Sequence, residues 1–268
     1  MFRALKRNNA SLSASSYQII WNTVGILFMV FLSNTSHAAN EVSITLSDPT
    51  EAPYTTAAGD GFFDKIAGEA FRRAGLQLKL IKLPAERGLV NANEGVEDGD
   101  LSRIAGLESS YPNLVRIPEK LIDMDFVAFS RKATPAKATW AELEHMPVGY
   151  IKGWKIFEKN LPPATQTTTA DSPEQLLTLL DKNRIDAALY DRWMGIALTK
   201  KLHINDVHVV EPALTVREMF IYLHKRHADK VPAITAALRA IKAEGLYSRI
   251  CREKFSVLAK HTPQCEVK

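Results

Sequence analysis

Two charged residues of opposite sign lie next to short apolar segments, where each can bind a ligand. Arg103 lies near the end of the short segment 101–104, and Asp191 directly follows the segment 185–190. If both segments are strands of an open α/β sheet, the two charges lie at the edge where such sheets bind ligands. A zwitterion would then satisfy both residues. Structural roles are the alternatives: an ion pair for Arg103 and a helix N-cap for Asp191.

The other reactive residue types form no enzyme or metal signature. The sequence contains no G-x-S-x-G, H-E-x-x-H or P-loop pattern, and it lacks the glycine-rich loop of a dinucleotide site. His224 and His227 occur where a predicted strand passes into a loop, which does not place them on one face, so no metal site is expected. Arg87, in a helix predicted after Pro84, is either solvated or directed into a cleft.

The elements that must position these residues alternate along the chain. Residues such as Val42, Ile44 and Leu46 alternate with polar residues as in a strand, whereas the apolar residues of 62–74 recur at helical spacing. Alternating strands and helices predict parallel pairing with helices on the faces of a sheet. Predicted strands cover 42–46, 76–80, 101–104, 123–131, 148–151, 185–190 and 218–225; predicted helices cover 62–74, 85–93, 139–143, 153–159, 174–182, 191–200 and 231–255.

The N-terminal segment 1–38 has the pattern of a secretory signal. Arg3, Lys6 and Arg7 precede an apolar core, and Ser36-His37-Ala38 places small residues at the cleavage positions. A membrane anchor is the alternative, but the apolar run is shorter than the ~20 residues that a spanning helix needs. Removal of this segment leaves 31 basic and 30 acidic residues. A charge so close to zero gives no support for a nucleic-acid partner.

Both cysteines, Cys251 and Cys265, lie near the C-terminus. An exported protein meets an oxidising compartment, where the two thiols can pair. Closing a loop of this size would stabilise the fold by about 3 kcal/mol. Two separate thiols are the alternative.

Several short motifs occur in an order that resembles the type II periplasmic solute-binding proteins of the extracellular family 3 kind. The resemblance covers nearly the whole chain after the signal. The order of the motifs along the chain makes the resemblance specific. The motifs are Ala52-Pro53-Tyr54, Gly61-Phe62-Phe63-Asp64, the stretch with Arg103, Tyr111-Pro112, Val148-Gly149-Tyr150-Ile151-Lys152-Gly153, Asn183-Arg184-Ile185-Asp186-Ala187 and Gly245-Leu246-Tyr247. Around Ser102-Arg103 and Ser109-Ser110-Tyr111-Pro112 the residue order departs from that of amino-acid-binding members.

The resemblance implies an α/β fold of two lobes that close on a ligand. The expected first lobe comprises 39–127 and 222–268, and the expected second lobe comprises 128–221. The long strands 123–131 and 218–225 would cross between the lobes as hinges. In this family an aromatic residue stacks on the ligand, an arginine assisted by backbone N–H groups holds a carboxylate, and an acidic residue holds an amino group. The ligand contacts expected here are Tyr54, Arg87, Arg103, Gly153, Trp154 and Asp191. For Tyr54 and Trp154, a place in the core or on the surface is the alternative.

The function implied is capture of a small polar solute, an amino acid or a related zwitterion, in the periplasm. The protein is expected to act as a monomer without a cofactor and to serve ABC-type uptake through an inner-membrane permease, or sensing. One alternative is a ligand-sensing partner of a membrane receptor without transport. Another is an enzyme resembling the cyclohexadienyl dehydratases, for which Glu51 is the candidate general acid.

Overall fold

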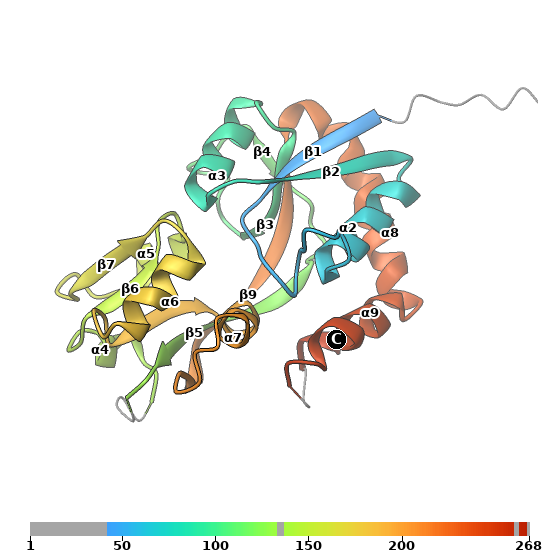
Figure 1. Ribbon diagram of the computed structural model, residues 1–268. Coiled ribbons are helices and arrows are strands. Elements are labelled where there is room, and N and C mark those ends of the chain that lie inside the picture. Colours follow the sequence, from blue (N-terminus) through green and yellow to red (C-terminus); the bar gives the residue numbers. More distant parts are fainter. Residues whose placement is uncertain (1–41, 133–136, 260–262, 267–268) are drawn as a thin grey trace, which may run out of the picture. The chain divides into compact units, whose positions relative to one another are not determined.

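The computed structural model describes residues 42–132, 137–259 and 263–266. The predicted signal, 1–38, lies outside these ranges. No helix within them has the length and hydropathy that a membrane span requires. The described chain alternates between strands and helices, as the sequence predicts (Figure 1).

A parallel sheet forms the centre of the first lobe. β1 pairs in parallel with β2 on one side and with β3 on the other. Ile44 and Leu46 of β1 are fully buried and share one core with Phe62 and Phe63 of α2. The elements of this lobe are β1 (Val42–Asp48), α2 (Phe62–Arg73), β2 (Leu76–Lys82), α3 (Ala85–Glu94), β3 (Gly99–Ile104), β4 (Leu114–Arg116), η1 (Lys225–Lys230), α8 (Val231–Ala243), α9 (Leu246–Phe255) and η2 (Pro263–Cys265).

The second lobe repeats this design on a smaller scale. β6 pairs in parallel with β7 and with β8. Ser172 caps α6 by accepting a hydrogen bond from the Gln175 backbone N–H, and Leu176, Leu177 and Leu180 of this helix are buried. The elements of this lobe are α4 (Trp140–Leu143), β6 (Val148–Ile151), α5 (Lys155–Asn160), β7 (Thr167–Ala170), α6 (Pro173–Asp181), β8 (Ala187–Asp191) and α7 (Arg192–Lys201).

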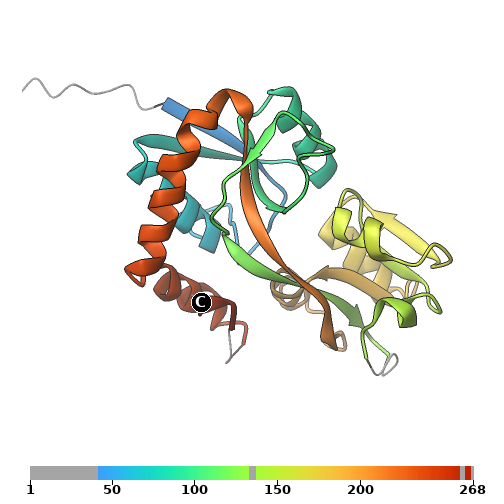
Figure 2. The same cartoon turned by 180° about the vertical axis from the view of Figure 1, so that it is seen from behind.

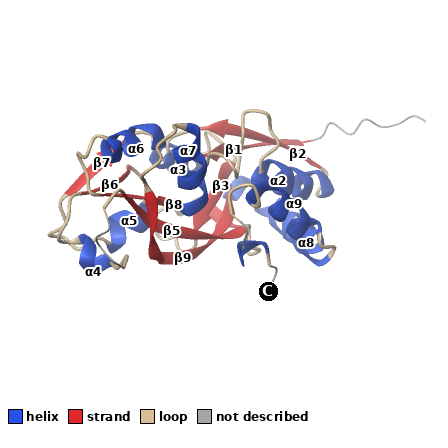
Figure 3. Cartoon of the chain, turned by 60° about the horizontal axis from the view of Figure 1, so that its bottom comes forward, coloured by secondary structure: helices blue, strands red, loops and turns tan. Residues whose placement is uncertain are grey.

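Two long antiparallel strands, β5 (Ile122–Ser130) and β9 (His208–His224), join the lobes (Figure 2). β9 pairs with β3 of the first lobe, and β5 pairs with β8 of the second. The described strands therefore form one continuous sheet in the order β2-β1-β3-β9-β5-β8-β6-β7, with β4 beside β9. Figure 3 shows the helices α2, α8 and α9 gathered beside one another next to this sheet. The predicted α/β fold of two lobes with two crossing strands is confirmed.

Two predicted elements differ from those observed. The helix predicted over 231–255 is interrupted at Gly245, whose φ of 72° is left-handed and ends α8 before α9 begins. The strand predicted over 218–225 begins ten residues earlier, at His208. Pro212 in this stretch argues against a strand. However, the pairing of β5 with β9 shifts register between Phe126 and Ala128 of β5, which interrupts the ladder near Pro212.

A disulfide joins Cys251 of α9 to Cys265 of η2, so that the C-terminal segment is attached to the last helix. Both cysteines are buried.

Candidate ligand-binding cavity

A cavity of about 50 Å³ lies between the lobes, beside the crossing strands. The first lobe contributes the ends of β1 and β3 and one side of α3. The second lobe contributes the segment from Gly153 to Ile156 and the start of α7. Most of the lining is apolar, and the side chains that provide it include Leu107, Met124, Phe126, Trp154, Met194 and Met219.

Arg103 lies in the cavity wall and is held rigidly by its own lobe. Its Nε and Nη2 donate to the two carboxylate oxygens of Asp100, each at 2.7 Å, and Nη2 also donates to the Ala85 carbonyl at 2.7 Å. Such a bidentate pair fixes the plane of the guanidinium. Among the described residues no acceptor contacts Nη1. This nitrogen is therefore free to donate to a ligand.

An irregularity in β3 makes this pairing possible. Residues three apart on a regular strand point to opposite faces, yet Asp100 and Arg103 meet side by side. The register of β3 against β9 shifts between these two residues, which turns their side chains to the same side. The Ser47 hydroxyl donates to Asp100 at 2.8 Å. Gly88 of α3 allows this close approach, because a Cβ at this position would lie 2.8 Å from Ser47 Oγ.

Ser102 adds a second polar group to the cavity wall. The residue is only 3% exposed, and its Oγ has no hydrogen-bond partner among the described residues. A buried hydroxyl without a partner is unfavourable, and a ligand that donates or accepts a hydrogen bond here would relieve this. Ser102 and Arg103 are consecutive residues of β3, and both line the cavity. A carboxylate could bind to both.

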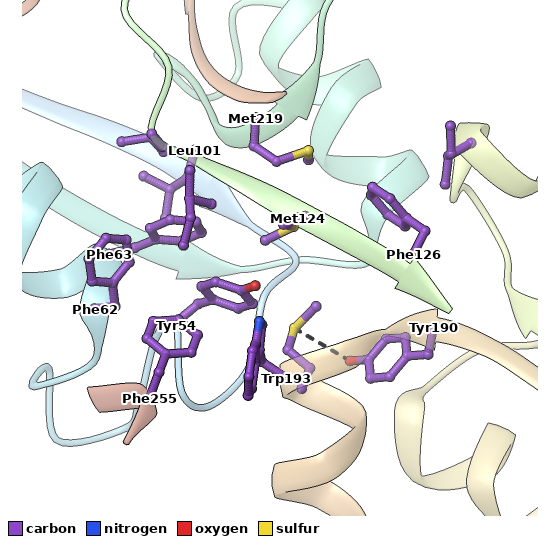
Figure 4. Close-up of a cluster of buried hydrophobic side chains, with 14 of the residues drawn as sticks. Tyr54, Phe62, Phe63, Leu101, Met124, Phe126, Tyr190, Trp193, Met219 and Phe255 are labelled. Carbon is purple, nitrogen blue, oxygen red and sulfur yellow. Dashed lines mark hydrogen bonds between the residues drawn. The ribbon is translucent and has the colours of Figure 1, made fainter. Parts of the chain in front are cut away.

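The opposite part of the wall is formed by methionine and aromatic side chains. Figure 4 shows Met124, Phe126 and Met219 projecting from the two crossing strands. The Trp154 ring stacks on Phe157 at a centroid distance of 5.8 Å and meets Phe126 edge-on at 5.9 Å. Methionine side chains adapt to ligands of different shape, so this wall suits an apolar group.

The second lobe packs closely against α3 at Gly153. A Cβ there would lie 2.6 Å from the Glu86 backbone nitrogen, and the φ of Gly153 is 86°. Next to this contact, Lys155 forms ion pairs with Glu86 of the first lobe at 2.5 Å and with Glu158 at 3.0 Å. These contacts cover one side of the cavity.

Asp191, expected to face Arg103 across the ligand, is not among the residues that line the cavity. The carboxylate is fully buried and caps α7: Oδ1 accepts from the Trp193 and Met194 backbone N–H groups, each at 2.9 Å. Oδ2 accepts from the Tyr54 hydroxyl at 3.2 Å. Burial raises the pKa of Asp191 to about 7, although these hydrogen bonds act in the opposite direction. The N-cap alternative describes this residue.

Tyr54 lies in the core and not on the ligand side. It is fully buried, its ring stacks on Phe63 at 4.8 Å, and it meets Phe255 edge-on at 5.4 Å (Figure 4). Its hydroxyl reaches Asp191, 137 residues away in the sequence. The structure thus places this ring in the core, which is the alternative to the expected stacking role.

Two further expected contacts differ from the structure. Arg87 is exposed on α3 and does not line the cavity, because Ala85, Gly88 and Leu89 form the buried face of this helix. Gly153 does line the cavity, but its backbone N–H already donates to Glu158 Oε1 at 2.9 Å. It is therefore not free for a carboxylate.

Glu51 lies in a hollow beside the cavity. It lines a neighbouring hollow of about 220 Å³ that also contains Lys82, Asp171 and Glu174, and it is not among the residues that line the inner cavity. The two spaces share Pro49 and Trp154 in their walls.

Several lining residues were missed by sequence reasoning. In the sequence, Ser102 stands out only as a departure from the motif of amino-acid-binding members. Met124 and Phe126 belong to a strand that the sequence indicates as a hinge, and their period-two spacing places both on one face. Met194 and Met219 carried no signal, because isolated methionines occur throughout protein cores.

Comparison with known proteins shows a shared fold. No family model matches the chain. An uncharacterized protein of Shewanella oneidensis is 25% identical over 187 residues, which cover 67% of this chain and 70% of that protein.

Solved structures of substrate-binding proteins superpose on most of the chain. A mutant of ArgBP from T. maritima has a TM-score of 0.66 and 18% identity and covers 80% of this chain and 95% of its own. A substrate-binding protein of an ABC uptake transporter from Streptococcus pneumoniae, with bound histidine, has a TM-score of 0.66, 18% identity and coverages of 82% and 95%. An ancestral arginine-binding protein bound to glutamine has a TM-score of 0.69, 16% identity and coverages of 80% and 97%. The chain therefore has the fold of these two-lobe proteins.

Proposed function

We propose that this chain is an exported solute-binding protein of the family 3 kind that captures a small carboxylate-bearing solute between its lobes. The observation that carries the proposal is the paired polar site in the cavity wall. Arg103 Nη1 and Ser102 Oγ both lack partners among the described residues, and both residues line the same apolar space. Because Arg103 is held by Asp100, its free edge is preorganised for binding.

The solute is proposed to be held by closure of the lobes. The limits of the lobes in this proposal are 39–127 with 222–268, and 128–221. Residues from both lobes line the cavity, so a bound solute would contact both and favour the closed arrangement. The ion pair between Lys155 and Glu86 would form only in that arrangement.

Binding is proposed in preference to catalysis. Glu51, the candidate general acid, does not line the inner cavity, where the carboxylate is proposed to lie. Among the lining residues that the structure describes there is no carboxylic acid. A periplasmic location and delivery to an ABC-type inner-membrane permease complete the proposal, supported by the names of the structurally similar proteins from ABC transporters.

A thermal-shift screen of small carboxylates, followed by calorimetric titration, tests the binding proposal. A ligand at 100 times its Kd adds about 2.7 kcal/mol to stability. Ser102→Ala removes one hydrogen bond to the ligand, worth about 1 kcal/mol, and should weaken binding about five- to tenfold. The matched control is Ser43→Ala, which removes another unpartnered hydroxyl of the same lobe outside the cavity. Equal affinities in the two variants would contradict the proposed site.

Transport is tested in cells that lack the gene. Uptake of the radiolabelled solute found in the screen should fall in these cells and return when the gene is restored. Unchanged uptake would exclude the transport role and leave binding intact.

A further inference from the structure

We propose that the solute is an apolar carboxylate that carries no ammonium group next to its carboxylate. This inference rests on the proposed function, because it assigns a chemical class to the solute of the same cavity. Aliphatic acids of branched-chain size, and their 2-oxo or 2-hydroxy forms, belong to this class. α-Amino acids do not.

The hydrogen-bonding groups that line the cavity favour a carboxylate over an ammonium group. The described lining residues include two basic side chains, Arg103 and Lys155, and no acidic one. Lys155 is matched by two glutamates, and Arg103 is matched by Asp100 with Nη1 left over. A carboxylate would find a donor in this space, whereas an adjacent ammonium group would be buried without an anionic acceptor.

Asp191 cannot provide the missing acceptor as it stands. Its two oxygens accept three hydrogen bonds, from two backbone N–H groups and from the Tyr54 hydroxyl. An ammonium group would have to displace Tyr54, whose hydroxyl is itself buried and would then lose its partner. In addition, neither Asp191 nor Tyr54 is among the residues that line the cavity.

Asp48, next to the lining residues Pro49 and Thr50, is also engaged. Asp48 is fully buried and accepts hydrogen bonds from the Thr50 backbone N–H at 2.8 Å and the Thr50 hydroxyl at 2.6 Å. Its second oxygen pairs with Lys82 at 2.7 Å. Thr50 is the residue that reaches the cavity, and its hydroxyl proton points to Asp48. This corner of the cavity therefore offers no free negative charge.

The apolar part of the cavity wall determines which group the solute carries beside its carboxylate. Met124, Met219 and Phe126 from the crossing strands, with Trp154 from the second lobe, provide an apolar surface beside the polar pair. A cavity of about 50 Å³ has room for about four water molecules. A body of a few carbon atoms fits this space, and methionine side chains can adjust to it.

Matched pairs of solutes test the inference by calorimetric titration. Each pair differs by the ammonium group alone: leucine against 4-methylpentanoate, and valine against 3-methylbutanoate. We expect the acid without the ammonium group to bind at least about tenfold more tightly, because the corresponding amino acid would bury an ammonium charge without an anionic acceptor. Tighter or equal binding of the amino acid would overturn the inference. If Ser102→Ala still weakened that amino acid, the proposed function would stand. Failure of all four solutes to bind would count against both proposals.

Tyr54→Phe examines the reason behind the preference. The substitution keeps the ring and frees Asp191 Oδ2. If Asp191 is out of reach, the affinities for leucine and for 4-methylpentanoate should both stay within about threefold of the original protein, less than about 0.7 kcal/mol. Leucine binding that tightened tenfold or more would show that Asp191 accepts an ammonium group, and the inference would be wrong.

Discussion

Asp191 provides a prediction that does not depend on the identity of the ligand. The residue is fully buried, caps α7 and accepts a hydrogen bond from Tyr54. Asp191→Ala removes all of these acceptors, whereas Asp191→Asn retains the side-chain oxygen that caps the helix and removes the charge. The two variants therefore separate the hydrogen bonds from the buried charge.

The size of each effect follows from these contacts. Loss of the N-cap costs about 0.5–2 kcal/mol, and the buried Tyr54 hydroxyl left without an acceptor costs about 1–3 kcal/mol. We therefore expect Asp191→Ala to be less stable than Asp191→Asn by about 3 kcal/mol, or about 6–12 °C in Tm for a chain of this size. An exposed cleft charge, as the sequence suggested, would have had almost no effect on stability.

The charge adds a dependence on pH whose sign can be derived. The pKa of Asp191 is about 7 in the folded protein, against an ordinary value of 3.8 that applies to the unfolded chain. Between these values the folded state retains a proton that the unfolded state has lost, so this group makes stability fall as the pH rises from about 4 to 7. Three pKa units correspond to at most about 4 kcal/mol. Above pH 7 its contribution is constant.

Urea unfolding at pH 4.5, 6 and 8 measures both effects. Relative to the original protein, Asp191→Asn should gain stability steadily across this range, while the exposed Asp171→Asn in the same lobe serves as control. Subtracting the curves removes the contribution of the other carboxylates. A stability difference that stays the same at all three pH values would refute the raised pKa. Equal stability of Asp191→Ala and Asp191→Asn would refute the capping role.

Two other predictions concern the lobe contact and the C-terminal segment. Gly153→Ala places a Cβ 2.6 Å from the Glu86 nitrogen at a φ of 86°, so it should hold the lobes apart. Small-angle scattering should then show a larger radius of gyration, and titration should show at least about tenfold weaker binding. Gly68→Ala, with no atom within 4 Å of the added Cβ, is the control, and an unchanged radius and affinity of Gly153→Ala would contradict closure at this residue. Replacing Cys251 and Cys265 by serine opens a loop with a sequence separation of 14 and should lower stability by about 3 kcal/mol; mass spectrometry of the alkylated, unreduced protein checks the bond directly, and two alkylated thiols would contradict it.

The fold could be predicted because its signals are local and repeated. Alternation in β1 and helical spacing in α2 depend on which residues face the core, and that pattern is visible in a single segment. The order of strands and helices then limited the topology to parallel units. The short strands β4 and β7 escaped prediction. The burial pattern of β7, Thr167–Ala170, shows the reason: three threonines are exposed, so no alternation marks the strand.

The site was harder to predict because one residue type serves several roles. An aspartate after a strand is equally suited to bind an ammonium group and to cap the next helix. What decides the role of Asp191 is Tyr54, which comes from a loop at the other end of the sequence. Likewise an aromatic residue near the first loop stacks on a ligand or fills a core. The choice depends on Phe63 and Phe255, which no local pattern connects to Tyr54.

Arg103 lines the cavity, but the contacts that hold it there differ from those its position in the sequence suggested. Its place near a strand end suggested a side chain that extends freely toward a ligand, with a structural ion pair as the opposing interpretation. In the structure Asp100 binds Nε and Nη2 of Arg103, and Nη1 has no partner among the described residues. The pairing depends on the register shift in β3, because regular alternation would separate residues three apart. A shift of this kind is set by the pairing with β9, more than a hundred residues away along the chain, so spacing within β3 alone could not reveal it.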